Sequence, residues 1–301
     1  MNITSTWLTG ALVALAACGA TAPEEPSGTD PAPGETDDSW EAFRLAAVEI
    51  EGGPEPHYVY GGDMVAVGEA GLRQAYARYF GVGTKPAPGE GVATSSLSIL
   101  NDLGADILLE KRYSDSLGGR HELTYCIRSV SFSDTELAAL VPALEAATAS
   151  WTGLVNVGFR HDASQDANCT SNNTNVFFNV VNESGNDFFG LAFWPDDRRG
   201  SRQLRIYDAA FTTNANGRDL EGILRHETGH ILGFRHEHIW IGCQGSDTDD
   251  SRLVTAYDVN SVMHYPQCRP SMSGGYRQTQ LDYQGAIELY GMSSALTLAV
   301  L

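Results

Sequence analysis

The hydrophobic and polar positions predict a mixed α/β fold preceded by an irregular N-terminal stretch. Apolar residues spaced three and four apart predict helices at 69–80, 134–151, 218–233 and 280–290. Alternating or short apolar runs separated by turn residues predict strands at 57–67, 123–130, 154–159, 175–181, 188–194 and 203–207. Ser133 followed by Glu136 forms a capping box that marks the start of the second helix. Strands interspersed with single helices predict an α/β (α+β) layer arrangement with a twisted mixed sheet.

The N-terminus has the pattern of an export signal. Leu8 to Ala17 is apolar but too short to span a bilayer, and it ends in Leu15-Ala16-Ala17-Cys18. That ending resembles the bacterial lipobox, so we interpret 1–18 as a lipoprotein signal with Cys18 as the lipid anchor. The alternative is an ordinary secretory signal in which Cys18 is incidental. Either interpretation predicts an exported protein, a cell-envelope lipoprotein or a secreted one, that contacts membranes only through the lipid.

The charge of the chain limits its possible partners, and its cysteine content agrees with export. The formal net charge of −19 and the lack of a basic patch argue against a nucleic-acid partner. Acids and prolines dominate residues 19–41, which predicts a linker without a core of its own. Four further cysteines predict two disulfides in an oxidising compartment. Their order favours Cys126–Cys169 and Cys243–Cys268, and the other two pairings stay open.

The stretch HETGHILGFRHE, residues 226–237, carries the chemistry. On a helix His226 and His230 lie on one face, Gly233 lets the backbone turn back, and His236 then supplies a third nitrogen. Three imidazoles with one open tetrahedral position are the ligand set of one catalytic Zn²⁺ ion. Glu227 stands beside the first ligand, where a carboxylate can act as general base and then as general acid. The other five histidines have no ligand spacing, so we expect them to be hydrogen-bonded or solvated.

H-E-x-x-H-x-x-G-x-x-H is the signature of the metzincin zinc metalloproteases, and Phe234 and Glu237 extend it to the form of the astacin branch. Residues 261–265 (SVMHY) are similar to the astacin methionine turn. The resemblance covers roughly 123–291 and implies the metzincin fold, with an active-site helix, a methionine turn and a C-terminal helix. It also implies that Met263 lies under the metal, that Tyr265 is a switchable ligand and oxyanion donor, and that protein or peptide substrates are cleaved.

The edge strand that would hold the substrate includes Leu191, Ala192 and Phe193, in a stretch that looks more like the matrixins. Upstream, residues 60–63 (YGGD) are similar to the segment of astacin proforms in which an aspartate occupies the zinc. The resemblance thus implies that Asp63 is a propeptide switch. Release would need a cut between the two regions, and the polar, turn-rich segment Glu110 to Arg120 is where we expect it. The resemblance implies that the freed N-terminus then pairs with Glu237.

These observations divide the chain into a signal at 1–18, a linker at 19–41, a propeptide-like region at 42–118, a catalytic domain at 119–292 and a tail at 293–301. The predicted function is an exported zinc endopeptidase made as a zymogen. The alternative is a lipid-anchored surface binding protein with a structural zinc site, which would not need Glu227 as a base.

Overall fold

A computed structural model of the chain describes residues 40–50, 55–60, 64–80, 96–102, 109–110, 113, 121–185, 188–212, 218–237, 251–265 and 276–293. They all belong to the second of two compact units, Asp38–Leu301. Among them, no helix has both the length and the apolar character needed to cross a membrane.

A five-stranded sheet with the order β7-β6-β8-β10-β9 forms the centre of the C-terminal half. The bounds are β6 His121–Ile127, β7 Val157–His161, β8 Phe178–Glu183, β9 Gly190–Leu191 and β10 Gln203–Tyr207. Neighbouring strands run parallel except for β9, which pairs antiparallel with β10 at the sheet edge. This confirms the predicted mixed sheet. The antiparallel strand β9 contacts the helix that carries the histidine motif.

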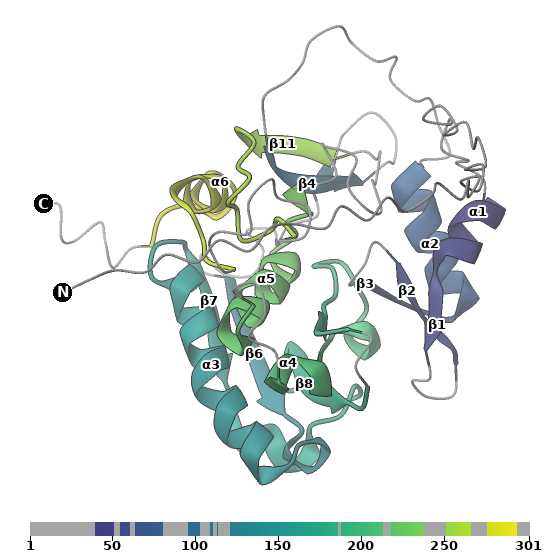
Figure 1. Cartoon of the computed structure of the whole chain (residues 1–301), viewed down its shortest axis with the longest axis vertical. Coiled ribbons are helices and arrows are strands. Elements are labelled where there is room, and N and C mark those ends of the chain that lie inside the picture. The colour runs from purple at the N-terminus through teal and green to yellow at the C-terminus, as the bar shows by residue number, and fades with distance from the viewer. Residues whose placement is uncertain are drawn as a thin grey trace, which may run out of the picture. The chain divides into compact units, whose positions relative to one another are not determined.

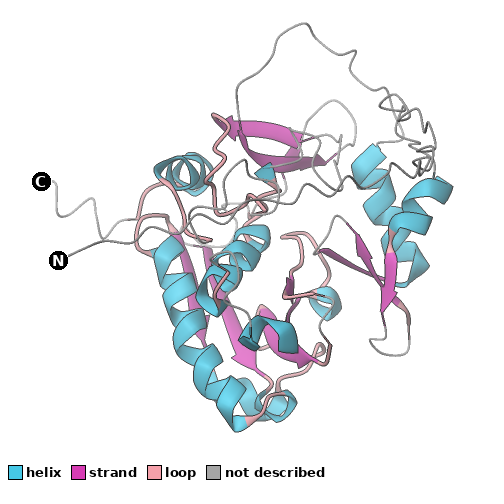
Figure 2. Ribbon diagram, viewed as in Figure 1, coloured by secondary structure: helices cyan, strands magenta, loops and turns pink. Residues whose placement is uncertain are grey.

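Two helices in contact with each other cover one face of this sheet (Figure 1). They are α3, Asp134–Thr152, and α5, Leu220–Ile231; α4, Asp208–Thr212, and α6, Gln280–Tyr290, complete this part of the fold (Figure 2). Trp151 of α3 is fully buried, stacks on Phe234, and donates from Nε1 to the Arg225 carbonyl over 3.2 Å. The apolar side of α3 therefore fixes the position of the helix that carries the histidine motif.

Two smaller sheets contain the strands of the N-terminal half. The first has the order β1-β2-β3, with β1 Val48–Ile50, β2 His57–Tyr60 and β3 Met64–Val67, flanked by α1 Trp40–Ala46 and α2 Gly68–Phe80. The second has the order β11-β4-β5, with β4 Ser96–Asp102, β5 Leu109–Glu110 and β11 Ser251–Thr255. Because β4 pairs with β11, a segment from the first third of the chain forms a sheet with the segment that leads into the methionine turn.

Short 3-10 helices lie at Ser129–Ser131, Ala163–Asn168 and Arg199–Ser201. Cys126 and Cys169 form a disulfide with a Cα–Cα distance of 5.6 Å, which agrees with the favoured pairing. Cys18, Cys243 and Cys268 lie outside the described residues.

Most predicted elements occur, with shifted ends. The capping box of Ser133 and Glu136 is present, and α6 has the predicted bounds. The stretch 188–194 is regular only at β9, because the Trp194 N–H bonds to the side chain of Asp197 and the chain turns. The single strand expected at 57–67 is instead β2 and β3, with 61–63 outside the described residues. Strands β4 and β11 were not predicted, because they pair with each other across about 150 residues of sequence.

Candidate metal centre and active site

The three histidines of the motif converge on one point. The Nε2 atom of His236 lies 3.3 Å from that of His226 and 3.1 Å from that of His230. All three residues are buried, with at most 4% of their surface exposed. Zinc bonds of about 2.05 Å in a tetrahedron separate imidazole nitrogens by roughly 3.3 Å, so the observed spacing fits that ion. No other group of three candidate ligands occurs among the residues that the structure describes.

Hydrogen bonds at the far side of the His226 and His230 rings direct their Nε2 atoms toward the centre. His226 Nδ1 lies 2.7 Å from the Val262 carbonyl, and His230 Nδ1 lies 2.7 Å from the Phe234 carbonyl. A carbonyl only accepts, so each Nδ1 carries the proton and each Nε2 presents its lone pair. Such a carbonyl partner is the usual outer support of a metal-binding imidazole. The donor set therefore fits Zn²⁺ by chemistry as well as by spacing.

The turn after α5 brings the third histidine back to the first two. Gly233 has φ +95°, its N–H bonds to the His230 carbonyl, and the Phe234 N–H bonds to the Gly229 carbonyl. These two bonds form a Schellman motif, which needs a left-handed residue at the glycine position. The sharp turn predicted at Gly233 is present, and it sets the path to His236.

The methionine turn lies directly under the zinc helix. A Cβ added at Gly229 would stand 2.4 Å from Met263 Sδ, so the thioether contacts the helix backbone between the ligands. The Glu237 N–H bonds to the Met263 carbonyl over 3.0 Å. Tyr265 follows, and its ring centroid is 4.3 Å from that of His236. The structure thus brings Met263 and Tyr265 to the histidines, as the resemblance implied.

Asp282 of α6 fixes the methionine turn through hydrogen bonds, a role that no sequence motif indicated. Its carboxylate accepts from the Ser261 hydroxyl and from the Val262 N–H, as well as from the Thr279 N–H of its own capping box. Burial raises the pKa of Asp282, while the bonds from Ser261, Thr279 and Val262 act in the opposite direction. The pattern Thr279-x-x-Asp282 marked the helix start, but only the fold places that carboxylate under the methionine turn.

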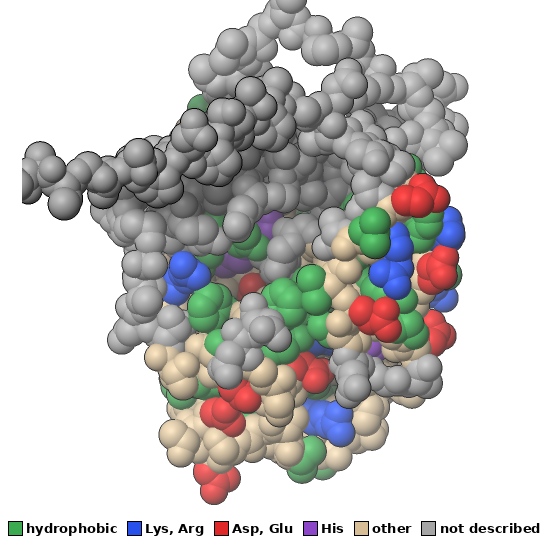
Figure 3. Space-filling view, turned by 45° about the vertical axis from the view of Figure 1, so that its right-hand side comes forward, with side chains coloured by type: hydrophobic (Ala, Val, Ile, Leu, Met, Phe, Trp, Pro, Cys, Tyr) green, Lys and Arg blue, Asp and Glu red, His purple; other side chains and the backbone are tan. Residues whose placement is uncertain are grey.

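Glu227 lies between the zinc helix and the edge strand. It is 3% exposed, and a Cβ built on Gly190 would come within 2.8 Å of its Cγ and Oε1. Only glycine at the start of β9 leaves room for this carboxylate. Leu191, Ala192 and Phe193 follow with at most 1% exposure. Figure 3 shows histidine side chains in a recessed part of the surface among hydrophobic ones.

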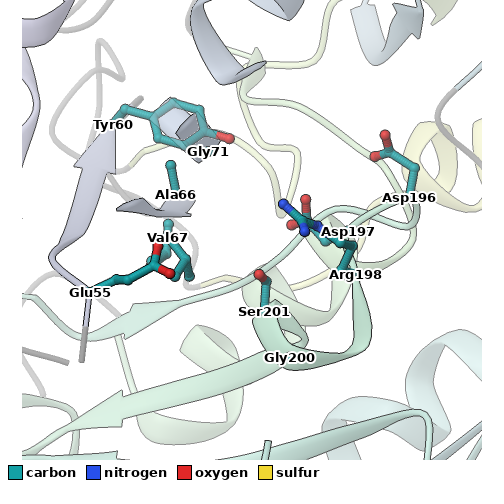
Figure 4. A pocket seen from close by; sticks show the side chains of 11 residues that line it. Glu55, Tyr60, Ala66, Val67, Gly71, Asp196, Asp197, Arg198, Gly200 and Ser201 are labelled. Atoms are coloured by element: carbon teal, nitrogen blue, oxygen red, sulfur yellow. The ribbon is translucent and has the colours of Figure 1, made fainter. Parts of the chain in front are cut away.

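Part of the N-terminal half contacts this edge. Met64 of β3 forms a parallel bridge with Ala192, and Trp194 Nε1 donates to the Tyr60 hydroxyl over 3.2 Å. The Trp194 ring is in turn 5.8 Å from that of His230. A cavity of about 650 Å³ lies beside these contacts, with Tyr60 and Val67 on one wall and Asp196 and Ser201 on the other (Figure 4). No zinc ligand lines it.

Comparisons with known proteins place the chain in a class. No family model matches it. It is 29% identical over 170 residues to the zinc metalloproteinase nas-2 of Caenorhabditis elegans. The aligned region covers 48% of this chain and 50% of that protein. The chain therefore spans about half the length of that relative. Similar solved structures are myroilysin (TM-score 0.41, 14% identity) and the zinc protease high choriolytic enzyme 1 of Oryzias latipes (TM-score 0.37, 19% identity).

Myroilysin covers 60% of this chain and 95% of its own, and the choriolytic enzyme covers 59% and 96%. The match to nas-2 agrees with the predicted resemblance to the astacin-like metzincins.

Replacing the third ligand should abolish tight metal binding. We expect His236→Gln to lower zinc affinity at least about 100-fold, because two imidazoles cannot complete the ligand set. Metal analysis after dialysis should find one zinc per chain in the unmodified protein and almost none in the variant. His161→Gln is the control, since His161 pairs with Asp166 away from the site. Equal zinc content in all three proteins would contradict the site.

Proposed function

We propose that the chain is an exported zinc-dependent endopeptidase made as a zymogen. The observation that carries this proposal is the convergence of three imidazole nitrogens, two of them within 3.3 Å of the third, near the buried carboxylate of Glu227. When bound, zinc would polarise the scissile carbonyl and lower the pKa of the attacking water. His226, His230 and His236 would hold it.

The chain's own groups supply the other steps. Glu227 takes the proton from the attacking water and delivers it to the leaving amine. Tyr265, whose half-buried ring lies beside that of His236, would donate to the oxyanion that develops on the carbonyl oxygen. The substrate lies extended along residues 190–193 and bonds to their main chain. The bridge between Met64 and Ala192 supports this placement, because it shows that an extended segment fits against that edge.

A methyl group added at Gly190, which faces Glu227, should reduce catalysis without removing zinc. We expect Gly190→Ala to lower casein hydrolysis by the activated protein about 10- to 100-fold, because the added methyl displaces the carboxylate. Glu227→Ala should abolish hydrolysis, and both variants should retain one zinc per chain. Gly200→Ala is the matched control, since a Cβ there meets nothing within 4 Å.

Casein cleavage by Glu227→Ala would refute the proposed base. An unmodified, zinc-loaded and processed protein that cleaves neither casein nor a peptide library would favour the surface binding protein.

The proposed zymogen rests on the hairpin of β2 and β3. Asp63 lies outside the described residues, but Tyr60 and Met64 on either side of it contact Trp194 and Ala192 at the edge of the site. A carboxylate oxygen is a good zinc ligand, so an aspartate between these two contacts would take the place of the water at the metal.

If Asp63 blocks the metal, Asp63→Ala should make the uncut chain active. We expect hydrolysis of a fluorogenic peptide by the full-length variant to approach that of the processed enzyme, while the full-length unmodified protein stays silent. Asp134→Ala is the matched control, because Asp134 is an exposed aspartate at the start of α3. A variant as silent as the unmodified precursor, with zinc bound in both, would refute the aspartate switch.

His57 makes the contact between the hairpin and the catalytic sheet sensitive to acid. It is 4% exposed, and its Nδ1 has no hydrogen-bond partner. The prediction that this histidine is hydrogen-bonded or solvated is therefore wrong for Nδ1. Burial, followed by the charge of Arg205 on β10, lowers its pKa to about 4. Arg205 is itself 2% exposed, 4.0 Å from Glu183, and hydrogen-bonded to Tyr207. Protonating His57 would therefore bury a second cation beside Arg205.

The sign of the pH effect follows from this lowered pKa. The docked hairpin binds fewer protons than the free one, so docking is fully favourable above pH 6.5 and weakens as the pH falls toward about 4. The docking equilibrium should change by up to roughly a few hundredfold. We expect the activity of the uncut chain, divided by that of the processed enzyme, to rise over this range. His57→Leu should remove the rise, and an unchanged pH profile in that variant would exclude His57 as its cause.

Export completes the proposal. The signal at 1–18 and the lipid anchor Cys18 lie outside the described residues. The disulfide between Cys126 and Cys169 supports an oxidising compartment, since such bonds persist outside the cytosol.

A further inference from the structure

Two tyrosine hydroxyls bind the last carbonyls of the zinc helix region. Tyr113 donates to the Ile231 carbonyl over 2.8 Å, and Tyr290 donates to the Leu232 carbonyl over 2.6 Å. Ile231 directly follows the second ligand, His230, and the bend at Gly233 begins two residues later. These carbonyls lie where the chain leaves the helix, at a point where helices need outside hydrogen-bond partners. The two hydroxyls therefore act on the backbone that carries His236 to the metal.

Tyr113 is part of the catalytic core although it lies far upstream of the motif. It is 5% exposed, and its ring centroid lies 5.3 Å from that of Phe177 and 6.4 Å from that of Tyr290. Burial raises the pKa of Tyr113 well above its usual value, so the hydroxyl stays protonated and remains a donor. Without its ring, the core would contain a cavity beside the end of α5.

The segment before Tyr113 is also attached to the catalytic part. Strand β5 pairs with β4, and β4 pairs antiparallel with β11 in a register that includes Ile99 with Arg252 and Ser96 with Thr255. By contrast, the upstream sheet of β1, β2 and β3 has an apolar cluster of its own, to which the catalytic part contributes Trp194. Strand β4 and Tyr113 thus bind the catalytic part directly, whereas the sheet of β1, β2 and β3 packs mainly on its own helices.

We propose that Tyr113 is a positioning residue of the mature enzyme, which fixes the Ile231 carbonyl and with it the bend that presents His236. The activating cut then falls before Tyr113, within or upstream of the first part of the segment Glu110 to Arg120. A cut after Arg120 would remove the residue that holds the helix end. This inference rests on the proposed zymogen function for the cut, but the positioning role can be measured in the uncut chain.

The first test removes one hydroxyl from the full-length protein. In Tyr113→Phe we expect zinc to leave about tenfold faster when a chelator is added, and the visible absorption bands of the Co²⁺-substituted protein to shift. Tyr125→Phe is the matched control, because Tyr125 is another buried core tyrosine, 3% exposed, on β6. In the processed enzyme, Tyr113→Phe should lower kcat and leave KM nearly unchanged, because only the metal site is disturbed.

A merely structural role would change thermal stability alone. If Tyr113→Phe lowers Tm but has the zinc release rate and Co²⁺ spectrum of the unmodified protein, the positioning role is refuted. If Tyr113→Ala fails to fold, the Phe variant still decides the question, because it keeps the ring.

The second test locates the N-terminus of the active form by sequencing and intact mass after natural processing of the full chain. We expect it at or before Tyr113. A fully active chain that begins after Arg120 would overturn the inference while leaving the peptidase function intact. If no processed form cleaves peptides, the proposed function fails, and zinc release and the Co²⁺ spectrum still decide the role of Tyr113.

Discussion

The close approach of three imidazole nitrogens, with those of His226 and His230 each within 3.3 Å of that of His236, is the constraint on which the site depends. Lone pairs at this distance repel one another unless a cation lies between them, so without the ion the surrounding structure must hold the rings together. Backbone carbonyls of Val262 and Phe234 do so by fixing the far side of two rings. The metal-binding geometry is therefore a property of the loops around α5 as much as of the helix.

Those loops are held by elements from distant parts of the chain. Asp282 of α6 binds the methionine turn, Tyr290 binds the Leu232 carbonyl, and Tyr113 binds the carbonyl before it. Each of these partners is buried, so loss of any one would leave a backbone group unsatisfied at a cost of about 1–3 kcal/mol. The three histidines lie on a short helix and the turn after it. Their positions are fixed by Asp282, Tyr290 and Tyr113, which bind the adjoining backbone.

The N-terminal half has two different relations to the site. The hairpin of β2 and β3 meets the substrate edge at Ala192 and Trp194, and it shelters the neutral His57 against Arg205. Because the Nδ1 of His57 has no hydrogen-bond partner and the ring lies beside a buried cation, that contact is weaker than a fully hydrogen-bonded one would be. Residues 96–113 instead supply a buried ring, a hydrogen bond and a paired strand to the catalytic part.

The sequence by itself determined the histidine cluster, the position of Glu227 beside it and most helices, because these follow from local spacing. Residues four apart on a helix share a face, and Gly233 had to turn, whatever the rest of the fold did. Tertiary structure alone decided the pairing of β4 with β11, the role of Asp282 and the fit of Gly190 against Glu227. Each of these joins residues far apart in the chain, and no local pattern encodes which distant backbone a strand, carboxylate or glycine will meet.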